Sequence, residues 1–388
     1  MVAPGFLARS PEEVGIDSDR LEELLARAGR DIEKGRLPGA QIAIARHGRI
    51  AAVRTFGRMT PAEDAPPATD ETLYCIYSST KGIFAVALWM LIENRALRLE
   101  ERVADIVPEF GSNGKDTITV EQLVLHLGGF PYAPLGPPDW EDRDQRLSSF
   151  HRWRLNWEPG SRFEYHPTSA HWVIAEILER RSGMDFRRFV RERITQPLGL
   201  DELFIGLPPE QDHRVATVVQ MTPPVEPPGG WRGVDPAALL VFNEPRNRRV
   251  GVPGGGGITG AAELALLYQP LIHGGEDVFG RRILRRETIE HCTRVLTGVQ
   301  HVDPLMRIPV NRAVGLVVAG DDGRSYLRGF GRSVSPRAFG HGGAGGQIAW
   351  GDPTTGLSFG YVTNGFTDFL ENGRRITALS TLACAALR

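Results

Sequence analysis

Residues 77–92 read YSSTKGIFAVALWMLI, a short polar segment that leads into the longest apolar run of the chain, Gly82 to Ile92. This run of 11 residues is too short to cross a bilayer, which takes about 20 residues. We therefore expect a buried core helix that begins near Ser78. Ser78 and Lys81 are three residues apart, and residues at that spacing share one face of a helix. The stretch predicts a hydroxyl beside an amine at the start of the most apolar helix.

This pairing is chemically useful because a serine hydroxyl is a poor nucleophile until a neighbouring base accepts its proton. Lysine can be that base when burial lowers its pKa, and the apolar sequence after Lys81 makes burial credible. Free backbone N–H groups at a helix N-terminus can also stabilise a developing oxyanion. Ser79 has Gly82 at the same spacing, so Ser78 is the better candidate. A capping serine beside a surface lysine gives the same pattern, and the rest of the chain must decide between them.

Periodicity predicts secondary structure on both sides of this segment. Thr119 with Gln122 three residues later indicates a capping box. We expect helices at 17–34, 168–182, 185–195, 261–273, 286–295 and 369–386, a hairpin at 41–57, and strand-like runs at 313–320, 324–330, 345–352 and 357–365.

Strands and a helix thus occur at both ends, with helices and loops between them. This order predicts an α/β (α+β) fold in which an antiparallel sheet, built from both termini, is flanked by helices and carries an inserted helical, loop-rich region. We expect a sheet domain of residues 1–75 and 310–388 and a mainly helical inserted domain of residues 76–309. The active site would lie at their interface.

Several segments, in this order, resemble the serine β-lactamase / D,D-peptidase superfamily, especially its class C β-lactamase-like branch and the related family VIII carboxylesterases. The segments are LPGAQIAIARHGRI (37–50), YCIYSSTKGIFAVALWMLIENRALRLEERVADIVPEF (74–110), ITVEQLVLHLGGFP (118–131), PGSRFEYHPTSAHWVIAEILERRSG (159–183) and RAFGHGGAGGQIAWGDPTTGLSFGYVTNG (337–365). The resemblance implies a serine hydrolase that acts through an acyl-enzyme on Ser78.

The same resemblance assigns a role to Tyr165. In this family a tyrosine from a Y-x-N or Y-x-S motif lies near the serine, and Tyr165 in FEYHP (163–167) is at the matching position. A phenol with a pKa near ~10 relays protons only if a cation stabilises its phenolate, and the Lys81 ammonium would do so. Ser78, Lys81 and Tyr165 are therefore expected to share protons as one coupled network.

The third residue of this motif departs from the family. Pro167 replaces the amide or hydroxyl side chain that helps to hold a lactam or peptide, and proline offers no side-chain hydrogen bond. His166 or Ser169 could take its place in binding substrate.

The family's K-T-G strand corresponds here to His341-Gly342-Gly343, which is expected to lie beside the substrate. By resemblance, the backbone N–H groups of Ser78 and Ala344 would form the oxyanion hole. A lysine in this motif offers a fixed charge to a substrate carboxylate, whereas histidine is mostly neutral at pH 7.

Together with Pro167, His341 favours a carboxylesterase that cleaves small esters. A β-lactamase or D,D-peptidase-like amide hydrolase, acyl transfer to a small acceptor, and a non-catalytic binding module are the alternatives.

The amino-acid composition excludes some classes of binding partner. The 388 residues include 45 Lys and Arg against 47 Asp and Glu, a net charge of −2, which gives no general attraction to nucleic acid or an anionic membrane. The three cysteines are far apart and no metal-binding spacing occurs, so neither a disulfide framework nor a metal or other cofactor is expected. The first 21 residues lack a basic region followed by an apolar one, so we expect a cytoplasmic location. The expected partner is a small ester, and the oligomeric state is open.

The pocket walls are harder to predict. Loops 128–150 and 206–257 are expected to line it, with Trp140 and Trp231 as apolar walls. The glycine-rich stretch PGGGGITG (253–260) has no GxxxxGK pattern, so we interpret it as a flexible segment beside the active site rather than a phosphate-binding loop.

Overall fold

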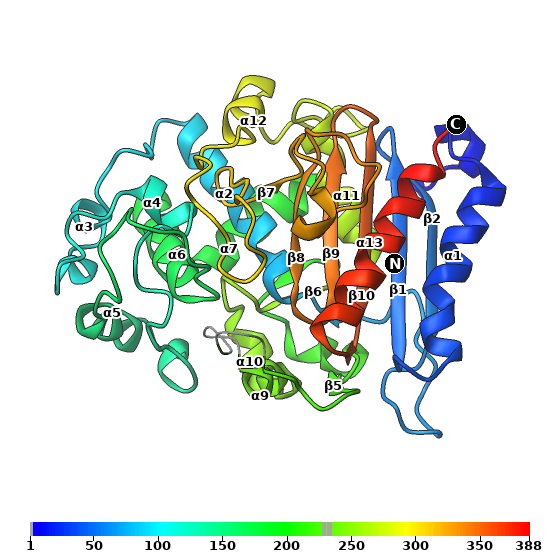
Figure 1. Ribbon diagram of the computed structural model, residues 1–388, viewed down its shortest axis with the longest axis horizontal. Helices are drawn as coiled ribbons and strands as arrows, with labels where there is room; N and C mark the ends of the chain where they lie inside the picture. Colours follow the sequence, from blue (N-terminus) through cyan, green and yellow to red (C-terminus); the bar gives the residue numbers. More distant parts are fainter. Residues whose placement is uncertain (1–2, 227–229, 231–234) are drawn as a thin grey trace.

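The computed structural model describes residues 3–226, 230 and 235–388. Its largest sheet has six antiparallel strands in the order β2-β1-β10-β9-β8-β7. The strands are β1 (Gly39–Arg46), β2 (Arg49–Gly57), β7 (Val317–Val318), β8 (Phe339–Gly343), β9 (Gln347–Asp352) and β10 (Leu357–Thr363). Ile42 of β1 lies opposite Tyr361 of β10, so the two ends of the chain meet in the middle of this sheet (Figure 1). The predicted sheet built from both termini is confirmed.

Helices cover both faces of this sheet. Side chains alternate along β1: Ile42 and Ile44 pack with the helices α1 (Ser18–Glu33) and α13 (Phe369–Ala385). Ala43, on the other face, belongs to the core that includes α11 (Ala261–Ile272). The predicted helix at 17–34 is α1, and the Asp17 side chain caps it by accepting from the backbone N–H of Arg20.

The rest of the middle segment lies to one side of the sheet (Figure 1). It contains α2 (Lys81–Glu93), α3 (Val103–Ile106), α4 (Val120–Val124), α5 (Arg143–Arg152), α6 (Ser169–Ser182), α7 (Phe186–Val190), α8 (Gln196–Leu198), α9 (Pro236–Leu239), α10 (Pro245–Val250), α12 (Arg286–Cys292) and the short strands β3 (Tyr74–Cys75), β4 (Phe204–Ile205), β5 (Val219–Gln220) and β6 (Gly257–Thr259), with β11 (Gly365–Phe366) pairing with β5. The helix α2 is buried from Lys81 to Leu91, as its apolar sequence predicts. The capping box of Thr119 and Gln122 is present at the start of α4. Within the described ranges, no helix combines the length and the apolar character needed to cross a membrane.

The helix α11 bears on the expected division into domains. It belongs to the segment 76–309, yet it packs directly on the sheet, where the Ser358 hydroxyl donates to the Ala265 carbonyl at 2.7 Å. The middle segment is therefore not wholly separate from the sheet, and the two-domain division stays a prediction.

Several predicted elements differ in detail. The strand-like run expected at 313–320 contains only the two-residue strand Val317–Val318. The helix expected near Ser78 begins with a 3-10 turn at Tyr77–Thr80, because Tyr77 has a φ of 46° and cannot continue a regular helix. The helix expected at 185–195 passes into a π-turn at Arg191–Thr195. The run 324–330 is not a strand: it forms the 3-10 turn Ser325–Arg328, closed by a hydrogen bond from the Phe330 N–H to the Ser325 carbonyl.

Candidate active site

Ser78 and Lys81 meet at the start of α2, as their spacing predicts. Nζ of Lys81 lies 3.2 Å from Oγ of Ser78, 2.7 Å from the carbonyl oxygen of Pro167 and 2.6 Å from the carbonyl oxygen of Gly254. Lys81 is fully buried, whereas Ser78 is partly exposed and lines a pocket. Burial, together with the nearby charge of Arg312, holds the pKa of Lys81 well below its usual value.

The three oxygen partners of Lys81 are compatible with either protonation state of its amine. An ammonium has three donors and would donate to all three oxygens, whereas a neutral amine has two N–H groups and one lone pair. Burial, which lowers the pKa of Lys81, favours the neutral amine. The two carbonyls can only accept, so a neutral Lys81 donates to Pro167 and Gly254 and turns its lone pair toward the third partner. That partner is the Ser78 hydroxyl. The geometry lets Lys81 accept the proton of Ser78.

Gly254 was not expected among the site residues. A Cβ there would lie 2.8 Å from the carbonyl oxygen of Pro167 and 3.1 Å from Cα of Thr168, so the position has no room for a larger residue. All residues from 251 to 260 are buried, which corrects the interpretation of this stretch as a flexible segment. The useful sequence signal was the run of glycines itself, because glycine often marks a close approach between two backbones.

The end of β8 is fixed against the turn that holds Ser78. The hydroxyl of Ser79 donates to the carbonyl of His341 at 3.1 Å. A Cβ on Gly343 would lie 2.3 Å from the carbonyl oxygen of Ile76, so glycine is needed for this approach. Ala344, Gly342 and Gly343 line the same pocket as Ser78. The predicted oxyanion-hole residues are thus on one pocket wall.

Tyr165 also faces this pocket, and Nζ of Lys81 lies 5.1 Å from the centre of its ring. Burial raises the pKa of Tyr165 to about 12, although Arg312 and the Ser78 hydroxyl both act to lower it. In the part of the chain that the structure describes, the buried hydroxyl makes no hydrogen bond of ordinary geometry. Tyr165 therefore stays a protonated phenol near neutral pH, able to donate.

His341 is buried and neutral, and its tautomer follows from its neighbours. Nη1 of Arg312 lies 3.3 Å from Nε2 of His341, and Nδ1 lies 2.7 Å from the carbonyl oxygen of Gly342. Because a guanidinium only donates, Nε2 accepts and the proton is on Nδ1. Burial and the charge of Arg312 hold the pKa of His341 well below its usual value.

The fixed charge that His341 lacks is supplied by Arg312. Arg312 lines the pocket, lies 5.4 Å from the centre of the Tyr165 ring, and makes no ion pair with a carboxylate among the described residues. An arginine stays charged at all ordinary pH values. Sequence reasoning missed it because no motif marks a residue 29 positions before His341.

His166 and Ser169 do not reach the substrate side of the site. His166 is fully buried: its Nε2 accepts from the backbone N–H of Phe130 at 3.1 Å, and its Nδ1 lies 2.7 Å from the Glu164 carbonyl. The Ser169 hydroxyl donates to the carbonyl of Phe130. The structure thus corrects the expectation that either one compensates for Pro167. The carbonyl of Pro167 instead holds Lys81.

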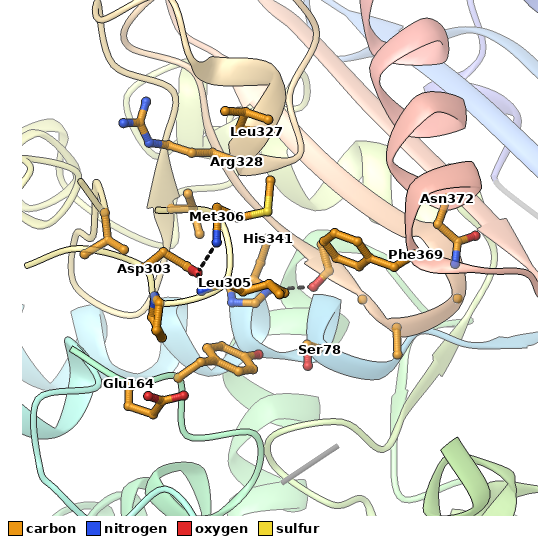
Figure 2. A pocket seen from close by; sticks show the side chains of 18 of the residues that line it. Ser78, Glu164, Asp303, Leu305, Met306, Leu327, Arg328, His341, Phe369 and Asn372 are labelled. Atoms are coloured by element: carbon orange, nitrogen blue, oxygen red, sulfur yellow. Dashed lines mark hydrogen bonds between the residues drawn. The ribbon is translucent and has the colours of Figure 1, made fainter. Parts of the chain in front are cut away.

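The pocket above Ser78 has a volume of about 490 Å³ (Figure 2). Its apolar walls include Leu239, Leu305, Met306, Ile308, Leu327, Phe366 and Phe369. The expected wall residue Trp140 is instead buried in the core, stacked on Phe242, and Trp231 lies outside the described residues. The expected loop 128–150 supplies none of the described lining. Among the described residues, no three His, Cys, Asp or Glu side chains are grouped to hold a metal ion.

This fold and this pocket define a class of protein: the chain is a serine hydrolase. The model of the beta-lactamase family matches residues 19–382, which is most of the sequence, and the chain belongs to that family.

Known proteins resemble the chain over most of its length. The esterase/beta-lactamase LipL of Mycobacterium tuberculosis (strain ATCC 25618 / H37Rv) is 28% identical over 321 residues, covering 77% of this chain and 70% of LipL. The crystal structure of a penicillin-binding protein homologue from Caulobacter crescentus is 29% identical with a TM-score of 0.80, covering 96% of this chain and 99% of the homologue. A family VIII carboxylesterase has the same fold, with a TM-score of 0.81 at 24% identity, covering 95% of this chain and 99% of the esterase.

Proposed function

We propose that the protein is a carboxylesterase that cleaves small carboxylic esters through an acyl-enzyme on Ser78. The observation that carries the proposal is the contact of the fully buried Lys81 amine with the Ser78 hydroxyl, because a neutral amine that donates to Pro167 and Gly254 has its lone pair left for the Ser78 proton. The similarity to LipL, whose name includes esterase, and the shared fold of the family VIII carboxylesterase support it.

The acylation step uses three side chains. Oγ of Ser78 attacks the ester carbonyl while its proton passes to Nζ of Lys81, and the backbone N–H groups of Ser78 and Ala344 stabilise the oxyanion. The carbon–oxygen bond to the alcohol then breaks, and the alkoxide takes a proton from the hydroxyl of Tyr165. The proton on Lys81 passes to the Tyr165 phenolate and restores both groups. Before this last transfer the Lys81 ammonium lies beside the Tyr165 phenolate, which is the arrangement that the expected coupled network requires.

Deacylation repeats these transfers with water in place of the alcohol. Water attacks the acyl carbonyl and gives a proton to Lys81. The bond between the acyl carbon and Oγ of Ser78 then breaks, and Oγ takes a proton from Tyr165, which Lys81 reprotonates. If an alcohol attacked in place of water, the result would be acyl transfer, with the same proton transfers by Lys81 and Tyr165.

A second candidate is an amide hydrolase of the β-lactamase or D,D-peptidase kind. The observation in its favour is Arg312, a permanent positive charge in the pocket that a substrate carboxylate could meet. Against it, Pro167 has no side-chain amide to hold a lactam or peptide, and the pocket walls are largely apolar.

The test compares p-nitrophenyl esters with nitrocefin and a D-Ala-D-Ala peptide. We expect a higher kcat/KM for the best ester than for either amide, and complete loss of both acyl-enzyme and turnover in Ser78→Ala. Intact-mass measurement after a fluorophosphonate should place the adduct on Ser78. A nitrocefin kcat/KM equal to that of the best ester would favour the second candidate, and an adduct on another serine would exclude the proposed nucleophile.

The proposal also includes a cytoplasmic location, which cell fractionation with an antibody to the native chain can test.

A further inference from the structure

The turn at residues 303–308 holds two apolar side chains over the pocket. Oδ1 of Asp303 accepts from the backbone N–H groups of Leu305 at 2.8 Å and Met306 at 2.9 Å. The Asp303 N–H donates to the carbonyl of Ile308, and the Arg307 N–H donates to the carbonyl of Asp303. One carboxylate and two backbone hydrogen bonds therefore fix this turn.

The side chains of the turn divide between solvent and pocket. Arg307 is exposed, whereas Leu305 and Met306 are half-buried and line the pocket with the buried Ile308. Figure 2 shows Leu305 and Met306 on one side of the space above Ser78 and Phe369 on the other. An apolar group bound there would lie between two apolar walls, directly over the candidate nucleophile.

The wall that carries Phe369 is also held rigidly. The buried Arg375 donates from Nη1 to Asn372 at 2.8 Å, from Nη2 to the Thr367 hydroxyl at 3.1 Å and from Nε to Asp31 at 2.9 Å. Thr367 and Asn372 both line the pocket and flank Phe369 in sequence. Both walls are thus built before any substrate arrives, which is typical of small-molecule sites.

The pocket is larger than the smallest esters require. A space of about 490 Å³ falls in the range of roughly 300–1,000 Å³ that holds drug-sized ligands. An acetyl group would leave most of it filled with water against apolar side chains, and burying further methylene groups there is favourable.

We propose that the natural ester carries a large apolar group, a medium-length aliphatic chain or an aromatic ring, which binds between the 303–308 turn and Phe369. Asp303 is a positioning residue, because it acts through Leu305 and Met306. The inference rests on the proposed esterase function and adds its substrate class. The group could be the acyl or the alcohol part of the ester.

Two series of substrates show whether the large apolar group belongs to the acyl or to the alcohol part of the ester. In the acyl series, p-nitrophenyl acetate, butyrate, hexanoate and octanoate are compared; in the alcohol series, ethyl, butyl, benzyl and 1-naphthyl acetates. We expect kcat/KM to rise with size in one series, by up to about fourfold for each added methylene. A flat or falling profile in both series would overturn the inference.

Single substitutions in the two walls test where the preference for large esters arises. Met306→Ala and Phe369→Ala should each reduce the preference for the largest ester over acetate at least tenfold, and Met306→Trp should move the optimum to smaller esters. Leu370→Ala is the matched control for Phe369→Ala, because Leu370 is the next residue, is 65% exposed and does not line the pocket; its size profile should match the wild type. A profile that survives in both alanine variants would also overturn the inference.

Asp303 is tested by rescue. Asp303→Ala should flatten the size profile, whereas Asp303→Asn, which keeps an oxygen acceptor at Oδ1, should largely preserve it. A structural defect unrelated to the turn would lower kcat/KM for acetate and for the largest ester equally, and that result would contradict the assigned role.

Binding to Ser78→Ala separates this inference from the esterase proposal. By calorimetry, this variant should bind the largest ester of one series more tightly than the smallest ester of that series, which should be the series in which kcat/KM rises, and Met306→Ala should remove the difference. If the wild type cleaves no ester but this preference is present, the esterase proposal fails and the apolar site stands. If esters are cleaved and the preference is absent, the apolar site fails and the esterase proposal stands.

Discussion

The guanidinium of Arg312 and the imidazole of His341 lie 3.3 Å apart, buried together beside Tyr165. The contact fixes His341 as a neutral acceptor and leaves Arg312 as the charged member of the pair. The pocket therefore has a positive charge beside residue 341, although His341 replaces the lysine of the family motif and is itself neutral. A lysine at 341 would meet Arg312 as a like charge, so His341→Lys is not a simple way to gain affinity for carboxylates.

The charge of Arg312 sets the pH dependence that we predict for the reaction. The active form needs Lys81 neutral and Tyr165 protonated, so kcat/KM should rise with pH as Lys81 loses its proton and fall as Tyr165 ionises. Arg312 lowers the pKa of both groups. Arg312→Gln should therefore move both limbs of the profile to higher pH. For the limb of Tyr165, whose ring centre lies 5.4 Å from the guanidinium, the shift should be roughly one unit or more.

Two variants control this measurement of kcat/KM against pH. Arg312→Lys keeps a cation and should shift the profile less than Arg312→Gln. Arg328→Gln removes another arginine of the same pocket, but Arg328 is paired with Asp322, so it should leave the position of both limbs unchanged. Limbs that stay in place in Arg312→Gln would show that Arg312 does not act on Lys81 and Tyr165.

The second prediction concerns the coupling of Lys81 and Tyr165. Lys81→Ala removes the acceptor of the Ser78 proton, and Tyr165→Phe removes the donor to the leaving group. Each should lower kcat by roughly 10²–10⁴-fold, the usual range for general acid–base catalysis. Because both serve one proton circuit, the double variant should be only slightly worse than the poorer single variant. Single-turnover kinetics with a p-nitrophenyl ester measure this, and multiplicative losses would mean two independent roles.

The local parts of this structure could be predicted from sequence, and the distant parts could not. Asp17 and the Thr119–Gln122 pair cap their helices with partners three residues away, so a short stretch contains all the information. The spacing of Ser78 and Lys81 is equally local. The other two oxygen atoms around Lys81 come from positions 86 and 173 residues further along the chain.

The family resemblance covers part of that distance, because it assigns Tyr165 and Ala344 to the site of Ser78, and both residues line the same pocket as Ser78. It did not identify Arg312, which belongs to none of the matched segments. The position of His166 next to Pro167 favours a role in binding substrate, but its ring is buried and faces the core. Its partner Phe130 lies 36 residues earlier in the chain, so the local sequence does not show which way the His166 ring faces.

The third prediction tests the close approach at Gly254. Gly254→Ala would force its Cβ against the backbone of Pro167 and Thr168, moving the carbonyl groups that hold Lys81. A displacement of catalytic groups by about 1 Å can lower the rate on the order of 10²-fold, so kcat should fall strongly. Gly255→Ala is a matched control: its Cβ would meet its nearest neighbour, the carbonyl carbon of Tyr77, at 3.9 Å, an ordinary contact. Equal kcat values for the two alanine variants would argue against a role of this approach in holding Lys81.

The fourth prediction concerns stability in mild acid. His126, His166 and His171 are buried around the site, and burial lowers the pKa of each, that of His166 to about 3. The unfolded chain binds protons on these histidines near pH 6.5, whereas the folded chain does not. Stability should therefore fall as the pH drops from about 7 to 5, with a slope that approaches about 1.4 kcal/mol per pH unit for each fully neutral histidine once the pH is below about 6.5.

Urea unfolding at pH 7, 6 and 5 measures that slope, and His166→Gln isolates one histidine. Glutamine can still accept from the Phe130 N–H, so the variant keeps this contact but has no group that titrates at residue 166. Lys81 and Glu263 also titrate with shifted pKa values, Glu263 at about 8 because of burial, but they do so in both proteins and cancel in the comparison. Carboxylates with ordinary pKa values contribute mainly below about pH 5. The free energy of unfolding of His166→Gln should thus change with pH less steeply than that of the wild type. The difference in slope should correspond to about one fewer proton bound on unfolding. Equal slopes would mean that His166 is protonated in the folded protein as readily as in the unfolded chain.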